Sequence, residues 1–228
     1  MVARLSKLRQ ALADHRQLLL FGMLVATIAI GPLLTFLDSG RILLNLCLGL
    51  TLLVTTMSPM EDRARGHTFT AIVGVAIVLG LAPLGTPLGQ PGPVMLAVWS
   101  AIAFVAAART FRYALSTQQV STPHLLAALN AYLLVGVFLG AIWIALEQVL
   151  PGSLLTGGQP VPDFGLPDGI YFSFVTLATL GYGDITPATQ LSRGLAVFEA
   201  VFGQLYLAVM VARLVSLRIA EETRDAPR

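Results

Sequence analysis

The sequence predicts an all-α membrane protein with six transmembrane helices, and the prediction rests on composition and on the spacing of charge. Of the 228 residues, 56% are hydrophobic and only 11% are charged, and the mean hydropathy is +0.79. A soluble domain usually carries about 25% charged residues, so this chain lacks the polar residues to cover a soluble fold. A net charge of +2 argues against nucleic-acid binding, and the single cysteine, Cys47, excludes a disulfide-built scaffold.

Long uncharged segments give the number of crossings. Roughly 20 apolar residues span a bilayer. Turn residues interrupt the third segment over 80–93, so that it holds two crossings. Six helices with short loops nearly account for the chain, and we expect no sizeable soluble or regulatory domain. The uncharged segments are 17–37, 42–60, 68–108 and 113–146, and a further apolar segment covers 194–216.

Lysine and arginine are distributed unequally between the two sides of the predicted membrane. With the N-terminus in the cytoplasm, 12 of the 14 fall on the cytoplasmic side, and only Arg41 and Arg193 fall outside. This asymmetry follows the positive-inside rule and requires an even number of crossings. We therefore expect a multi-pass membrane protein with both termini cytoplasmic, and the short loops suggest the plasma membrane of a prokaryote, its inner membrane. Trp99 and Trp143 are expected at the outer interface.

The chain after the fifth crossing, which we expect over 124–149, is built differently. A Gly- and Pro-rich extracellular loop over 151–167 precedes a helix over 168–179 that is too short to span a bilayer. Asp168 follows a proline and suits the N-cap of this helix. We expect a re-entrant segment that enters and leaves on the outer side. Irregular backbone at membrane depth must be buried in protein or line a water-filled cavity, which indicates a pore or a substrate site.

Two glycines, Gly181 and Gly183, follow this short helix at alternate positions. Glycine adopts positive φ at low cost. Alternating such residues with ordinary ones lets successive carbonyl groups point the same way. A column of carbonyl oxygens can replace the hydration shell of a monovalent cation.

The string TLGYGD at 179–184 resembles the selectivity filter of the potassium-channel family, and the preceding helix resembles its pore helix. The family usually has Val at the position of Leu180. The resemblance implies a homotetramer embedded in lipid, with the ring of Tyr182 packed against Tyr171 or Phe172. It implies no cofactor other than K⁺ ions in the filter. K⁺ coordination is then expected at Thr179, Leu180, Gly181 and Tyr182, with Gly183 lining the outer mouth.

Support of the filter is expected from Asp184, Glu199 and Thr176. Glu199 is a carboxylate inside a spanning helix, where a functional role is the default interpretation. It could accept hydrogen bonds from Ser173 or Thr176, pair with a neighbouring subunit, bind ions directly or sense protons. Four acidic residues are expected near the outer mouth, where they would concentrate cations or serve only as caps and acceptors. They are Glu147, Asp163, Asp168 and Asp184.

The sixth crossing resembles the inner helix of the same family. The resemblance places Gly203 at a gating hinge, although a small residue there could also serve close helix packing. It makes one helical face the lining of the cavity and lower pore, where a hydrophobic constriction could gate by dewetting. That face carries Gln204, Leu207, Val211 and Val215.

The resulting organisation is a cytoplasmic segment over 1–17, a four-helix sensor-like domain over 18–115, a pore domain over 124–217 and a cytoplasmic tail over 218–228. A voltage sensor needs arginines repeated through the fourth crossing. Here Arg109 and Arg112 lie only at its cytoplasmic end, so we expect no strong voltage gating.

The function predicted is passive, K⁺-selective conduction. A weakly selective cation channel remains an alternative within this class. A secondary transporter is the alternative from another class, and it would show paired broken helices in two related halves, whereas one interrupted segment is visible. A membrane enzyme is not expected, because no nucleophile–base pair or cluster of metal ligands falls inside the predicted bilayer.

Overall fold

The computed structural model describes residues 16–34, 40–55, 73–74, 93–116 and 122–225. Most of this part of the chain is helical, with three short strands near one end. The elements are α2 (Arg16–Leu34), α3 (Gly40–Thr55), α5 (Pro93–Leu115), α6 (Thr122–Val149), β1 (Leu154–Thr156), β2 (Gln159–Pro160), α7 (Leu166–Leu177), β3 (Ile185–Pro187) and α8 (Gln190–Asp225).

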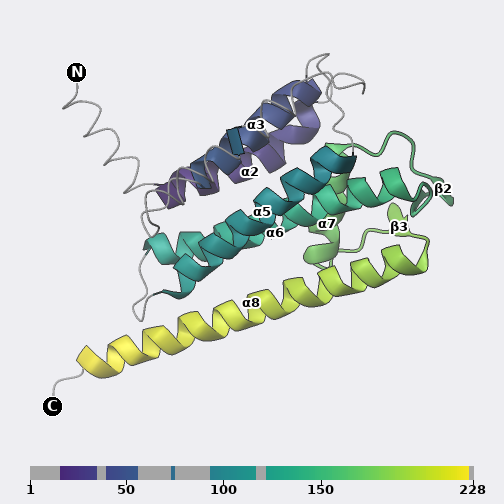
Figure 1. Ribbon diagram of the computed structural model, residues 1–228. Helices are drawn as coiled ribbons and strands as arrows, with labels where there is room; N and C mark the ends of the chain where they lie inside the picture. Colours follow the sequence, from purple (N-terminus) through teal and green to yellow (C-terminus); the bar gives the residue numbers. More distant parts are fainter. Residues whose placement is uncertain (1–15, 35–39, 56–72, 75–92, 117–121, 226–228) are drawn as a thin grey trace, which may run out of the picture.

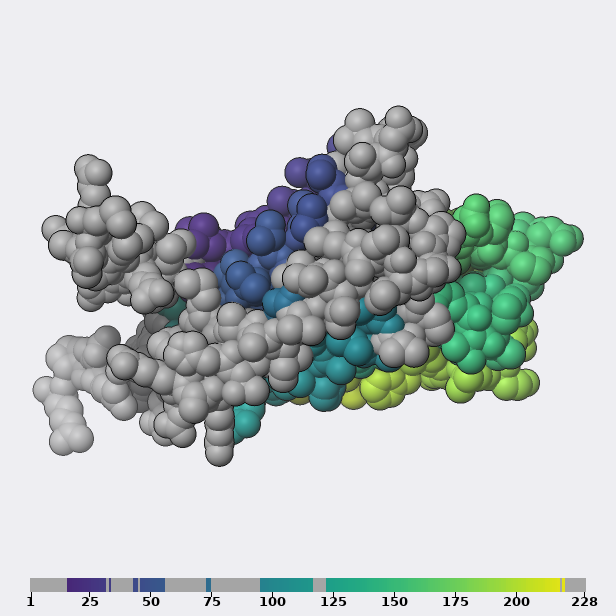
Figure 2. Space-filling view, turned by 45° about the horizontal axis from the view of Figure 1, so that its top comes forward, coloured from purple at the N-terminus to yellow at the C-terminus, as the bar shows by residue number. Residues whose placement is uncertain are grey.

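The long helices form a bundle around α6. In Figure 1, α5 and α6 lie side by side, α2 and α3 flank them, and the yellow α8 runs along the opposite edge. The short α7 is steeply inclined to the others and lies between α6 and α8. The strands and the connections of α7 gather at one end, which appears green in Figure 2 and is called the sheet end below.

Three described helices are long and apolar enough to cross a membrane, over Met95–Leu115, Thr122–Val149 and Gln190–Leu217. Two shorter apolar helical segments cover Arg16–Gly31 and Leu46–Thr55. The described residues therefore have the character of a multi-pass, mainly helical membrane protein, as the sequence predicts. The predicted third crossing lies outside the described residues except for 73–74, so six crossings stay a prediction.

Glycines allow α6 and α7 to pack almost backbone to backbone. A Cβ atom placed on Gly140 would lie 3.0 Å from the carbonyl oxygen of Gly169, and one on Gly169 would lie 2.6 Å from that of Gly140. One turn away, a Cβ on Gly136 would lie 2.5 Å from the ring of Phe174. Small residues at such crossings bring helices close in membranes. This contact fixes the short helix α7 against the bundle.

The segment after α6 forms a small sheet in place of the irregular loop expected over 151–167. The three strands are antiparallel in the order β2-β1-β3. Gly157 and Gly158, at φ 55° and 79°, make the two-residue turn between β1 and β2. Positive φ at both positions is what a type I′ hairpin turn requires. The expectation of an irregular loop here is therefore wrong, and the Gly-Gly pair is the signal that could have predicted the hairpin.

The ends of two helices also differ from expectation. Helix α7 begins at Leu166 after the N-cap Gly165, so Asp168 is the third helical residue and not the N-cap. Its Oδ2 accepts a hydrogen bond from the Gly165 backbone N–H at 3.1 Å. Helix α8 continues without a break to Asp225, past the start of the tail expected at 218.

Candidate functional site: a carbonyl-lined segment between α7 and α8

The residues after α7 are tied to its last turn by backbone hydrogen bonds. The N–H groups of Thr179 and Leu180 donate to the carbonyl oxygens of Thr176 and Val175, at 3.0 and 2.8 Å. The N–H of Gly181 also points to the oxygen of Val175, at 3.4 Å. The backbone carbonyl of Thr176 thus accepts a hydrogen bond from residues 179–183, which are called the filter segment below. The inner half of this segment is anchored to α7.

The backbone of the filter segment alternates in handedness. Thr179, Gly181 and Gly183 have φ of 57°, 58° and 80°, whereas Leu180 and Tyr182 between them do not have positive φ. The left-handed region costs a β-branched residue such as Thr179 more than it costs glycine. Reversal of handedness at every second residue turns consecutive peptide groups to the same side. The geometry of the segment is thus suited to a row of carbonyl oxygens.

The apolar side chains of the filter segment are uncovered in the single chain. Leu180 and Tyr182 are 57% and 68% exposed. Both line an apolar cavity of about 280 Å³ that α2, α3 and α7 complete. Tyr171 lines the same cavity. Phe172 packs edge-on against Trp143, with ring centroids 4.8 Å apart.

A hydrogen bond joins α7 to the residue that follows the filter segment. The hydroxyl of Tyr171 donates to Oδ2 of Asp184 at 2.6 Å. This bond is the main reason that the pKa of Tyr171 rises to about 12, with smaller contributions from burial and from the Asp184 charge. The same bond is the main cause that lowers the pKa of Asp184. Asp184 is therefore a hydrogen-bond acceptor beside the filter segment, and its support of a filter stays a prediction.

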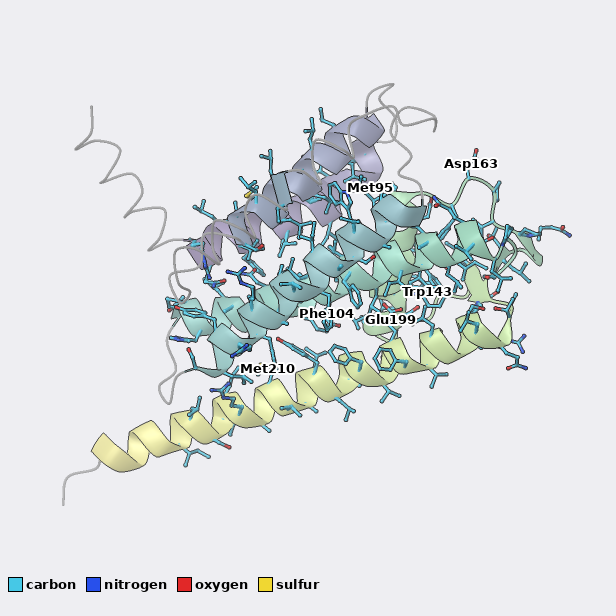
Figure 3. The ribbon with its side chains drawn as sticks, viewed as in Figure 1. Met95, Phe104, Trp143, Asp163, Glu199 and Met210 are labelled. Carbon is cyan, nitrogen blue, oxygen red and sulfur yellow. The ribbon has the colours of Figure 1, made fainter. Side chains whose placement is uncertain are left out.

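Glu199 lies between three helices. It has no exposed surface, and Figure 3 shows it next to Trp143, between α6 and α8. Trp143 Nε1 donates to Oε2 at 2.6 Å, and the hydroxyl of Ser173 lies 2.5 Å from Oε1. Ser173, and not Thr176, is thus the hydroxyl that reaches the carboxyl group. The network joins α6, α7 and α8.

Trp143 is the residue of this network that sequence reasoning missed. It is fully buried against Phe172 and Glu199, and its expected position at the outer membrane interface stays a prediction. An indole buries its ring in the core only where its N–H finds a partner. The sequence does show a carboxylate and a tryptophan in two apolar helices, which is a signal for a polar contact inside the bundle. The number of residues between them does not indicate that they bond to each other.

The inner face of α8 meets the filter segment at two residues. The side-chain amide of Gln204 donates to the hydroxyl of Thr179 at 3.3 Å. A Cβ atom on Gly203 would lie only 2.1 Å from the carbonyl oxygen of Leu177 at the end of α7. Gly203 therefore has a packing reason to be glycine, and its role as a hinge stays a prediction. Leu207, Val211 and Val215, expected along the pore, are exposed.

The four acidic residues expected at the outer mouth have different surroundings. Glu147 accepts hydrogen bonds from the backbone N–H groups of Gly152 and Leu154, at 2.6 and 2.9 Å. Asp168 and Asp184 accept the bonds described above. Asp163 is exposed and adopts φ 47°. Three of the four carboxylates thus stabilise local structure in addition to any effect of their charge.

The described residues hold no group of three or more His, Cys, Asp or Glu side chains placed to bind a metal ion. Oxygen atoms of the filter segment are separate candidates as cation ligands. These are the backbone carbonyls and the Thr179 hydroxyl. Such ligands suit a hard monovalent cation that exchanges rapidly.

Residues 128–218 match a family model described as "Ion channel". The chain is also 33% identical over 88 residues to two pore potassium channel c of Oryza sativa subsp. japonica, which covers 39% of this chain and 19% of the relative. It is 41% identical over 49 residues to two-pore potassium channel 4 of Arabidopsis thaliana, covering 22% of this chain and 17% of the relative. It is 44% identical over 50 residues to protein LctB of Geobacillus stearothermophilus, covering 22% of this chain and 37% of the relative.

The matched segments are thus short compared with the relatives themselves, since none reaches two fifths of the relative's length. The match to the family model covers α8 to Arg218 and most of α6, together with the sheet, α7 and the filter segment between them. Residues 128–218 are thus similar to an ion-channel family, and the relatives that this part of the chain resembles include proteins named as potassium channels.

Proposed function

We propose that four copies of this chain form a channel that conducts K⁺ passively and selectively across a membrane. The ions pass along a common axis lined by Thr179, Leu180, Gly181 and Tyr182, with Gly183 at the outer mouth. One chain offers one carbonyl oxygen at each level of the filter segment, and a dehydrated cation needs several at once. A ring of copies supplies them.

The observation that carries this proposal is the alternating handedness of the filter segment. Positive φ at Thr179, Gly181 and Gly183 turns consecutive carbonyl groups toward one side. A packing turn between two helices needs one left-handed residue, usually at the helix end. Here three left-handed residues alternate with ordinary ones, and one of the three is a threonine. A row of carbonyl groups that bind ions would explain this pattern.

Exposed apolar surface supports assembly around the filter segment. Leu180 and Tyr182 are more than half exposed in the single chain, although large apolar side chains there would not face an ion path. One face of α8 is similarly uncovered at Phe198, Val201 and Leu205, which are 59%, 52% and 60% exposed. Neighbouring copies and lipid together can cover these surfaces. Association in a bilayer then relies on packing and on specific polar contacts.

The remaining parts of the proposal concern gating and orientation. Within α5, Arg109 and Arg112 lie in the last two turns, and its preceding residues carry no charge, so movement of α5 would carry little gating charge. Val211 and Val215 on α8 form the hydrophobic constriction of the lower pore. Both ends of the chain face the cytoplasm of a prokaryotic cell, and the sheet end faces outward.

Flux from liposomes tests the proposal with a matched pair of variants. Gly181 and Gly194 both have open space where a Cβ would lie, but only Gly181 has positive φ, at 58°. Gly181→Ala should abolish K⁺ flux, because alanine is strained in the left-handed region, whereas Gly194→Ala should leave it unchanged. Equal flux in both variants would contradict a conducting filter.

The same liposomes decide how selective the pore is. Under opposed K⁺ and Na⁺ gradients, a selective filter sets a potential close to the K⁺ equilibrium value. A weakly selective cation channel would give a potential near zero. A flux that moves only with a coupled ion gradient would indicate a secondary transporter instead.

A further inference from the structure

The hydroxyl of Ser173 lies within hydrogen-bond distance of two oxygen atoms from different helices. Its Oγ is 2.8 Å from the carbonyl oxygen of Gly136 on α6 and 2.5 Å from Oε1 of Glu199 on α8. A hydroxyl group carries a single proton, although it can accept through two lone pairs. Two short oxygen–oxygen contacts therefore need two protons, and Ser173 supplies one.

The second proton cannot come from the backbone carbonyl, which only accepts hydrogen bonds. Trp143 Nε1 is a donor only, and its proton already lies on the line to Oε2 of Glu199 at 2.6 Å. If the carboxyl group were ionised, one of the two contacts of Ser173 would place oxygen lone pairs against each other without a proton between them. A protonated carboxyl group removes this conflict.

We propose that Glu199 carries a proton on Oε1 and donates it to Ser173. The hydrogen bonds then run in one direction, from Glu199 Oε1 to Ser173 Oγ and from Ser173 Oγ to the carbonyl oxygen of Gly136. The N–H of Trp143 donates to the other carboxyl oxygen, Oε2. Every polar atom of the network has a partner, and Glu199 is a neutral positioning residue that fixes α8 to α7 and α6.

The surroundings of Glu199 agree with a neutral side chain. It has no exposed surface, and burial of an unpaired charge is costly. Among the described residues, no cationic side chain acts on the carboxyl group. Up to residue 217, the titratable and charged groups on the packed elements, besides Glu199 itself, are His124, Tyr132 and Glu147 on α6, Asp168 and Tyr171 on α7, and Arg193, Tyr206 and Arg213 on α8. Of these, Tyr132 is the group on which the charge of Glu199 would act, and it is not a cation.

Loss of this proton would rearrange the network. Ser173 would turn its own proton to the carboxylate, and the carbonyl of Gly136 would then face an oxygen at 2.8 Å with no proton between them. Gly136 and Phe174 are at the close contact of α6 with α7, so repulsion there displaces the helix that carries the filter segment. Alkaline conditions should therefore reduce conduction reversibly. This consequence rests on the proposed channel function, whereas the proton itself does not.

Infrared spectroscopy of the purified protein tests the proton without any need for conduction. Wild-type protein near neutral pH should show the C=O stretch of a protonated carboxylic acid, and this band should disappear in Glu199→Gln. The matched control Asp163→Asn removes an exposed carboxylate at φ 47°, a conformation that asparagine tolerates, and should leave the band in place. A difference spectrum that contains only carboxylate bands of Glu199 would overturn the proposal.

Two further measurements keep the test decisive if Glu199→Gln folds poorly. In Trp143→Phe the C=O band should move to higher frequency, because Oε2 loses its donor. In the wild-type protein the band should convert into carboxylate bands as the pH is raised to about 10, beyond the ordinary range of carboxyl groups. If the C=O band responds neither to Trp143→Phe nor to the rise in pH, it does not arise from Glu199, and the proposal would fail.

The consequence for conduction has its own test in liposomes. Glutamine donates through its amide to Ser173 and accepts from Trp143, so it copies the protonated side chain. Glu199→Gln should therefore conduct like the wild type near neutral pH and should not lose flux at about pH 9, where the wild type should lose it. Equal loss in both proteins would show that this network does not control the pH response. Absence of flux in both at every pH would contradict the proposed function and leave the infrared result intact.

Discussion

Two glycines of α8 differ in whether they tolerate additional atoms. Gly203 touches the last carbonyl of α7, where a Cβ would lie 2.1 Å from the oxygen of Leu177. A backbone oxygen cannot move aside as the end of a flexible side chain can. A larger residue than glycine would therefore clash at this position. Gly194, on the same helix, has nothing within 4 Å. The two glycines therefore give opposite expectations for the same substitution.

Gly203→Ala should destabilise the protein by roughly 1–3 kcal/mol, the usual cost of overpacking a close contact. Gly194→Ala should be neutral or stabilising by up to about 1 kcal/mol, since alanine favours helix. Thermal unfolding of both variants in the same detergent checks this difference. Equal stabilities would show that α8 does not approach α7 as closely as described.

The bond between Tyr171 and Asp184 predicts a stability difference that depends on pH. The lowered pKa of Asp184 means that its contribution is present above the ordinary carboxyl pKa of about 3.9 and disappears as the pH falls. The raised pKa of Tyr171, about 12, means that its contribution is complete below about pH 10 and disappears as the pH rises through 12.

Tyr171→Phe should therefore be less stable than the wild type between about pH 5 and pH 9, and the difference should vanish in stronger acid or base. The loss should stay below about 1 kcal/mol because both side chains reach solvent. The free energy of unfolding of both proteins, measured across this pH range, checks how the stability difference depends on pH. A difference that is constant with pH would mean that the lost contact is apolar.

At the scale of elements, the turn after α6 depends on one carboxylate. Glu147 accepts two backbone N–H groups, those of Gly152 and Leu154, just before β1. Strand β1 in turn pairs with β3, which begins directly after Asp184. Stability of the hairpin is thus linked to the end of the filter segment through a continuous set of hydrogen bonds.

Glu147→Ala should leave two amide groups without acceptors and cost roughly 1–3 kcal/mol locally. Hydrogen exchange should then accelerate at Gly152 and Leu154 and, through the pairing, at the strand β3. The exposed substitution Asp163→Asn serves as the control and should not alter exchange in β1 or β3. Unchanged exchange in Glu147→Ala would show that the turn is held by its other contacts.

Sequence patterns predicted the apolar helices well and the contacts between them poorly. Uncharged segments gave α2, α5, α6 and α8 with starts close to those observed, because length and apolarity are local properties. The hairpin was missed, although Gly157-Gly158 marks it, because the segment was interpreted as a loop from its glycines and prolines. The bond of Trp143 to Glu199 joins residues 56 positions apart, and no local pattern contains it.

In the candidate site, too, local features were predictable from the sequence and contacts between helices were not. The short helix and the glycines of the filter segment were predictable, because a helix too short to span a membrane and residues able to adopt positive φ are visible in the sequence. The positive φ of Thr179 was not, because threonine has no preference for it. Gln204 was expected in the cavity, but its bond to Thr179 depends on how closely α8 approaches α7.

For the whole molecule, the decisive property is assembly. Four copies of a 24.2 kDa chain should elute from detergent as one species with about four times that mass of protein. Light scattering corrected for bound detergent measures this directly. A species with the mass of a single chain that gives no K⁺ flux in liposomes would contradict the proposed tetrameric channel.

Helix α8 has a mechanical consequence that follows from its length. Its 36 residues extend for about 54 Å, whereas the hydrocarbon layer of a bilayer is about 30 Å thick. Several turns must therefore project beyond the lipid, away from the sheet end, as a stiff rod without an interruption. Any load on this projecting part of α8, from a fused domain or a tethered bead, would act as torque on the half of the helix that contacts the filter segment.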